Sequence, residues 1–124
     1  MSFLERRKYP RVPGSFPCQV TVGPSSFVTQ TQNLSCGGAL CRLPRPIPLM
    51  TKLEIFLELP SPEGSSDRPI RIVGIVVRQE PASGSKEALS YPTAIYFSEI
   101  RPKDRRRIAE FVLNSMLSYD RRRS

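Results

Sequence analysis

The chain has 124 residues, the usual size of one domain, and 39% of them are hydrophobic, enough for one compact core but not for two. Lysine and arginine number 19 against 11 aspartates and glutamates, so the net charge of +8 favours anionic partners without naming one. Histidine is absent, which removes the usual general base and the commonest metal ligand and counts against an enzyme.

Six segments along the chain are predicted to be strands. The first 15 residues contain several cations together with Pro10, Pro13 and Gly14, and we expect them to form a flexible basic arm. After this arm, apolar residues alternate with other residues at the period of a half-buried strand, and Pro, Gly and Ser mark the connecting turns. The predicted strands cover residues 16–22, 26–34, 39–43, 52–59, 69–80 and 91–100.

The last part of the chain changes to helical spacing. From Pro102 onward one stripe collects apolar residues, among them Ile108, Phe111 and Val112. Six short strands and one amphipathic helix predict a mainly β fold, a six-stranded antiparallel barrel with an N-terminal arm and a C-terminal helix. We therefore expect an arm at 1–15, a barrel plus helix at 16–119 and a basic tail at 120–124, with residues 105–107 forming a solvated helix face.

The cysteines and the hydropathy pattern indicate the cellular compartment of the protein. Cys18, Cys36 and Cys41 contain no CxxC pair and are too few for a structural zinc site, so we interpret them as thiols of a reducing cytosol. No stretch is long enough to span a bilayer, and the N-terminus lacks the apolar run of a signal peptide. The expected protein is cytoplasmic, with no membrane insertion.

Two polar motifs carry the functional information. Residues 7–11, RKYPR, read RxxxR, and residues 33–38, NLSCGG, read D/N-x-S-x-x-G at a turn after the second strand. Each motif alone is weak, but their order and spacing, with six strands and a terminal helix behind them, are specific. The chain resembles the PilZ domain, the bacterial receptor for cyclic dimeric GMP (cyclic di-GMP), over essentially its whole length. Arg6, just before the first motif, also resembles the family pattern.

The resemblance implies a stand-alone bacterial receptor with no catalytic residue, metal or cofactor. It would bind cyclic di-GMP, change conformation and relay the signal to an unidentified downstream protein. The ligand-binding residues that the resemblance implies are Arg6, Arg7, Arg11, Asn33, Ser35, Gly37 and Gly38.

These residue types suit a ligand with two phosphodiester charges and two guanines. Arginine forks two donors onto guanine O6 and N7 or onto phosphate oxygens, and its flat guanidinium stacks on purines. Asn33 can hydrogen-bond a guanine edge, and Ser35 a phosphate or a base. Gly37 and Gly38 allow close backbone approach and positive φ. Ordering a loose arm costs about 1–2 kcal/mol per residue, so we expect an arm that is mobile without ligand and clamped with it.

Two other functions remain open at this stage. One is a PilZ-like adaptor that has lost nucleotide binding, against which the intact motifs argue. The other is a small basic barrel for single-stranded nucleic acid, disfavoured because the aromatic residues occupy core or helix-stripe positions rather than a stacking surface.

Arg42 and Arg78 could border the cyclic di-GMP site, but no pattern requires them there. Arg6 adds a stacking guanidinium, which favours an intercalated ligand pair over one ligand.

Overall fold

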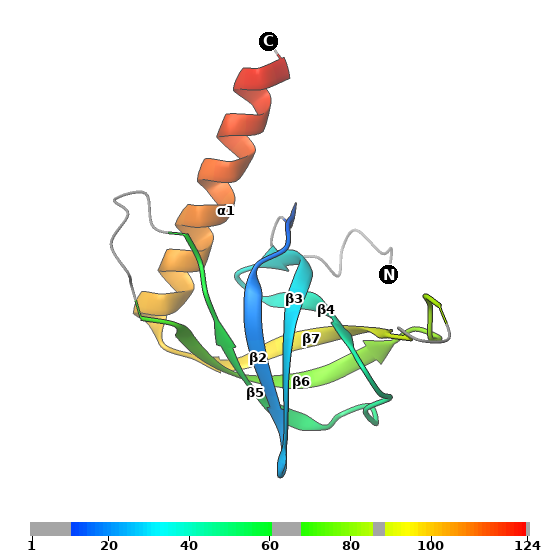
Figure 1. Ribbon diagram of the computed structural model, residues 1–124. Helices are drawn as coiled ribbons and strands as arrows, with labels where there is room; N and C mark the ends of the chain where they lie inside the picture. The colour runs from blue at the N-terminus through cyan, green and yellow to red at the C-terminus, as the bar shows by residue number, and fades with distance from the viewer. Residues whose placement is uncertain (1–10, 61–67, 86–88, 124) are drawn as a thin grey trace, which may run out of the picture.

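The computed structural model of the chain describes residues 11–60, 68–85 and 89–123. Six long antiparallel strands are followed by one helix, in the order that the sequence predicts (Figure 1). The elements are β2 (Pro17–Val22), β3 (Ser25–Ser35), β4 (Gly38–Leu43), β5 (Lys52–Leu57), β6 (Ile70–Gln79), β7 (Tyr91–Ile100) and α1 (Pro102–Arg123).

The six strands close into a barrel. Neighbouring strands follow the order β3, β2, β5, β6, β7, β4, and a further pairing of β3 with β4 joins the two ends. Closure pairs each of the six long strands that the structure describes on both sides, which protects their edges from aggregation with another chain. The predicted fold class, a mainly β six-stranded barrel with a C-terminal helix, is confirmed.

The barrel core follows the alternation of the strands. Inward-facing Val20, Ile55, Ile72 and Phe97, from four different strands, are at most 2% exposed and belong to one hydrophobic cluster. Register shifts in β6 and β7 interrupt the regular pairing at Gly74, where an added Cβ would lie 2.5 Å from the Ile95 side chain. Gly74 therefore lies at an irregularity that lets two strands approach closely.

A seventh, two-residue strand corrects the expected boundary of the arm. β1 (Val12–Pro13) pairs with the end of β3, and Val12 is 5% exposed and part of the core. The Thr31 hydroxyl adds a second anchor, donating to the Gly14 carbonyl at 2.8 Å and accepting from the Phe16 amide at 3.1 Å. The arm predicted at 1–15 therefore includes residues that belong to the barrel.

Helix α1 lies against the barrel with its first half only. Ile108 and Val112 are buried in the core cluster, and the Phe111 ring meets Phe16 edge-to-face with centroids 5.0 Å apart. The second half of the helix extends past the barrel (Figure 1). The helix continues to Arg123, so the tail expected to begin at residue 120 is wrong. No helix formed by the described residues is both long enough and apolar enough to span a membrane.

The Phe16–Phe111 contact provides a test of helix docking. Phe111→Ala removes a half-buried ring from the helix–barrel interface, and we expect the free energy of unfolding in urea to fall by about 2 kcal/mol. Leu113→Ala is the matched control, because Leu113 lies two residues away and is 55% exposed; its expected cost is below about 0.5 kcal/mol. Equal losses for both variants would contradict the docked position of the helix.

Candidate functional site

The site is built around the tight turn that joins β3 to β4. Ser35 is 3% exposed, and its hydroxyl accepts hydrogen bonds from the amides of Gly37 and Gly38 at 3.2 and 3.1 Å. The same hydroxyl lies 3.3 Å from the Gly38 carbonyl, to which it donates. In this structure Ser35 therefore closes the turn from inside instead of facing outward to a ligand.

Gly38 is required by the approach of the turn to β7. It pairs with Tyr96, and a Cβ placed on it would lie 2.5 Å from the Ile95 carbonyl oxygen. The Phe97 amide also donates to the Gly37 carbonyl at 2.9 Å, which ties the turn to the same strand. Close backbone approach was the expected use of these glycines, and for Gly38 the neighbour is β7. Positive φ was the other expectation; among the described glycines it occurs at Gly14, Gly23 and Gly84 instead.

The two motifs meet in space. The strand pairing of Val12–Pro13 with β3 brings Arg11 beside Asn33, and the Arg11 Nη1 donates to the Asn33 Oδ1 at 3.2 Å. These residues are 22 positions apart in the sequence. The structure thus joins the last arginine of RxxxR to the first residue of the turn motif. Arg6 and Arg7 lie outside the described residues.

Helix α1 also contacts the β3–β4 turn, a contact that the sequence did not predict. The Arg105 Nη1, from the first turn of α1, donates to the Cys36 carbonyl at 3.0 Å. Burial raises the pKa of the Cys36 thiol, and the Arg105 guanidinium opposes that increase. The prediction that residues 105–107 form a solvated helix face is wrong for Arg105 and Arg107. Arg107 donates hydrogen bonds to Asp104 and to the Arg68 carbonyl. Arg105 precedes Ile108 by three residues, so the apolar helix stripe already indicated its orientation toward the barrel.

The register of the sheet adds an outer surface beside the turn. Asn33 pairs with Leu40, Leu40 with Ala94, and Ala94 with Arg78, so these four residues form one row across four strands. Tyr96, the partner of Gly38 on β7, is 54% exposed next to this row. Arg78, which the sequence could not assign, therefore lies on the same outer face as Asn33.

Arg42 has a different role. Its Nη1 donates to the hydroxyls of Ser83 and Ser90 at 2.7 and 2.9 Å, so it holds the loop between β6 and β7.

Cys18 and Cys41 are buried, Cys36 is half-buried, and all three are free thiols. In the part of the chain that the structure describes, no group of three potential ligand side chains could hold a metal ion.

Comparison with known families decides the classification. A family model described as the PilZ domain matches residues 5–114, which include both motifs. The chain belongs to the PilZ domain family. No curated protein matches the chain significantly.

Solved structures show the same fold at low sequence identity. The PilZ domain of YcgR from Escherichia coli with cyclic di-GMP is 13% identical, with a TM-score of 0.70 over 94% of this chain and 96% of that one. The inhibitor of motility MotI/DgrA of Bacillus subtilis is 21% identical, with a TM-score of 0.75 over 91% of this chain and 52% of that one. The MrkH–cyclic di-GMP complex of K. pneumonia is 18% identical, with a TM-score of 0.70 over 94% and 55%. The chain thus spans nearly all of the YcgR domain but about half of MotI/DgrA and MrkH.

The close approach at Gly38 can be tested by substitution. Gly38→Ala would place a Cβ against the Ile95 carbonyl, which cannot rotate away, and we expect the free energy of unfolding to fall by at least about 2 kcal/mol. The comparison is Gly23→Ala, where φ is +55° but no atom lies within 4 Å; the left-handed backbone alone costs about 1 kcal/mol. Thermal unfolding measures both variants, and an unchanged stability of Gly38→Ala would contradict the contact.

Proposed function

We propose that this PilZ domain is a receptor for cyclic di-GMP that signals by rearranging its surface instead of by catalysis. The family assignment supports the proposal, as do the YcgR and MrkH neighbours, whose structures contain that ligand. The site residues remain those expected from the motifs: Arg6, Arg7, Arg11, Asn33, Ser35, Gly37 and Gly38. The chain lacks histidine, which agrees with a binding function.

The contact of Arg11 with Asn33 is the observation that carries the proposal. It brings a forked cationic donor and a guanine-compatible amide to one side of a rigid turn. In the proposed complex Arg11 turns to a phosphate or a guanine, and the Asn33 amide is released to a guanine edge. The ligand therefore replaces an existing hydrogen bond, which lowers the net gain from each contact and makes several converging arginines necessary.

Ser35 and the two glycines act in this proposal by shape. The Ser35 hydroxyl holds the amides of Gly37 and Gly38 within the turn, so the turn is organised before ligand arrives. A preformed turn does not lose backbone entropy on binding, whereas ordering the arm costs about 1–2 kcal/mol per residue. Arg6 and Arg7 would supply the contacts that offset this ordering.

The proposed output is a change in what the domain touches. Folding of residues 6–11 over the turn would alter the surface beside Asn33 and, through Arg105, the base of α1. A downstream protein would sense that change. We propose the bacterial cytoplasm as the place of action, and the free thiols Cys18, Cys36 and Cys41 suit this reducing compartment.

Isothermal titration with cyclic di-GMP tests the proposal. We expect Arg11→Ala to weaken binding by about 10- to 100-fold, the loss of one charge-assisted contact. Arg45→Ala is the matched control, since it removes the same charge from a side chain that stacks on Phe27 and bonds Ser25. Its affinity should stay within about twofold of the parent.

Three outcomes would contradict the proposal. Absence of heat with the parent chain would favour a PilZ-like adaptor without nucleotide binding. Equal losses for Arg11→Ala and Arg45→Ala would indicate general charge attraction. A steep salt dependence, together with tighter binding of single-stranded oligonucleotide, would indicate a nucleic-acid protein, because a dinucleotide releases few counterions.

The number of ligands is a separate prediction. We expect two cyclic di-GMP molecules per chain, since Arg6 would add a guanidinium that stacks between guanines. Arg6→Ala should lower the ratio toward one while the remaining site still binds. Sedimentation or titration at protein concentrations far above Kd measures the ratio, and a value of one for the parent chain would contradict the role of Arg6.

A further inference from the structure

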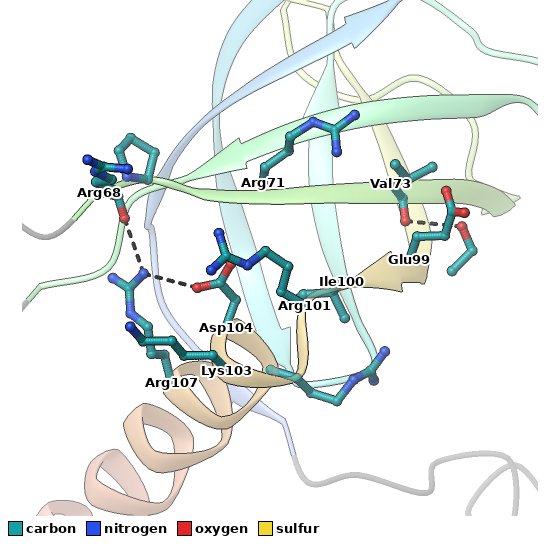
Figure 2. A pocket seen from close by; sticks show the side chains of 12 residues that line it. Arg68, Arg71, Val73, Glu99, Ile100, Arg101, Lys103, Asp104 and Arg107 are labelled. Atoms are coloured by element: carbon teal, nitrogen blue, oxygen red, sulfur yellow. Dashed lines mark hydrogen bonds and ion pairs between the residues drawn. The ribbon is translucent and has the colours of Figure 1, made fainter.

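A large basic pocket lies beside the base of α1, outside the proposed cyclic di-GMP site. It has a volume of about 1220 Å³ and is formed by the start of β6, the end of β7 and the first turns of α1 (Figure 2). Of the expected ligand-binding residues, those that the structure describes (Arg11, Asn33, Ser35, Gly37 and Gly38) do not line it. Its cationic lining residues are Arg68, Arg71, Arg101, Lys103, Arg105 and Arg107.

Arg71 of the lining pairs with Glu54 at 2.7 Å, but the rest of the positive charge in the pocket is only partly neutralised by the described residues. Glu99 and Asp104 are the carboxylates among its lining residues, and Asp104 already pairs with Arg107 at 3.4 Å. Among the described residues, Arg68, Arg101 and Lys103 have exposed side chains with no hydrogen-bond or ion-pair partner. The pocket therefore attracts an anionic group from another molecule.

The lining favours a polypeptide over a nucleic acid or a small molecule. Its described lining residues include no aromatic side chain, so they offer no surface on which bases could stack. Its carboxylates can accept hydrogen bonds from peptide amides, which a phosphate backbone lacks. Pro69, Val73 and Ile100 provide an apolar floor for side chains. Small-molecule sites are mostly apolar and about 300–1000 Å³, whereas this pocket is larger and largely charged.

One residue connects the pocket to the turn of the proposed receptor site. Arg105 lines the pocket and donates to the Cys36 carbonyl of the β3–β4 turn at 3.0 Å. The first turn of α1, which also carries Lys103, is therefore connected to the turn by a direct hydrogen bond. Any movement of the Cys36 carbonyl on ligand binding would reach the pocket wall through this side chain.

We propose that the basic pocket docks an acidic segment of the downstream partner protein, and that Arg105 couples this docking to cyclic di-GMP. Only the coupling rests on the proposed function; docking follows from the charge and shape of the pocket. The partner segment presents Asp or Glu to Arg101, Lys103 and Arg68, with apolar residues between the acids on the Val73–Ile100 floor. By linkage, cyclic di-GMP and the acidic segment change each other's affinity by the same factor.

Fluorescence anisotropy with a labelled synthetic peptide of alternating glutamate and leucine tests the docking. The variant Arg101→Gln with Lys103→Gln should bind this peptide at least about tenfold more weakly than the parent chain. The matched control, Arg45→Gln with Arg106→Gln, removes the same charge from exposed residues that do not line the pocket. It should stay within about twofold of the parent.

Each contrary result overturns docking. No binding by the parent, or an equal loss in the control, would show that the pocket has no selective affinity for an acidic peptide. Tighter binding of an oligonucleotide of equal charge, weakened by the same pocket substitutions, would assign the pocket to nucleic acid. Separate titrations with cyclic di-GMP distinguish this failure from failure of the proposed function, because the pocket variant retains every proposed ligand residue.

Coupling has its own measurement. The ratio of peptide Kd values without and with saturating cyclic di-GMP should differ from one in the parent chain and return to one in Arg105→Met. Arg105→Lys, which keeps a donor within reach of the Cys36 carbonyl, should restore part of the ratio. A parent chain that binds both molecules with a ratio of one, or an Arg105→Met variant with the parent ratio, would overturn the coupling.

Discussion

The β3–β4 turn is pressed against β7 so closely that Gly38 has no space for a Cβ. This contact comes from the closure of the barrel, since β4 must pair with β3 on one side and β7 on the other. The Ser35 hydroxyl accepts hydrogen bonds from the turn amides from inside. Among the described residues, every buried side-chain polar atom has a partner. In the proposed receptor, this turn is the fixed point toward which Arg11 and the other arginines of the first motif would converge.

Around this fixed turn the molecule arranges cations of two kinds. Arg11 and Arg105 are bonded to the turn itself, at Asn33 and at the Cys36 carbonyl. Others, such as Arg101 and Lys103, stand in an open pocket without a described partner. Part of the net charge of +8 thus lies at a proposed nucleotide site and part in a basic pocket beside α1 that would attract an anionic partner. Under the two proposals made above, this division would connect ligand binding at the turn to partner docking at the pocket.

Local patterns in the sequence were sufficient to predict the long strands and the helix, but not the residues at which the helix and the N-terminal arm end. Alternation identified all six long strands because each has one face in the core, and helical spacing identified α1. The alternation rule missed β1, since two residues are too few to show a period; its evidence is the burial of Val12 in the folded barrel. Residues 120–123 belong to α1, but they carry no apolar stripe, so periodicity could not identify them as helical and predicted a tail there.

The sequence by itself determined the family, through two short motifs in the right order, and the kinds of side chain that could recognise an anionic purine ligand. Only the tertiary structure decided which of these side chains meet. The Arg11–Asn33 contact spans 22 residues and the Arg105–Cys36 contact 69, and both depend on the register and closure of strands far apart in the chain. Periodicity reports whether a residue faces inward, but the neighbour across a barrel is set by pairings that no local pattern encodes.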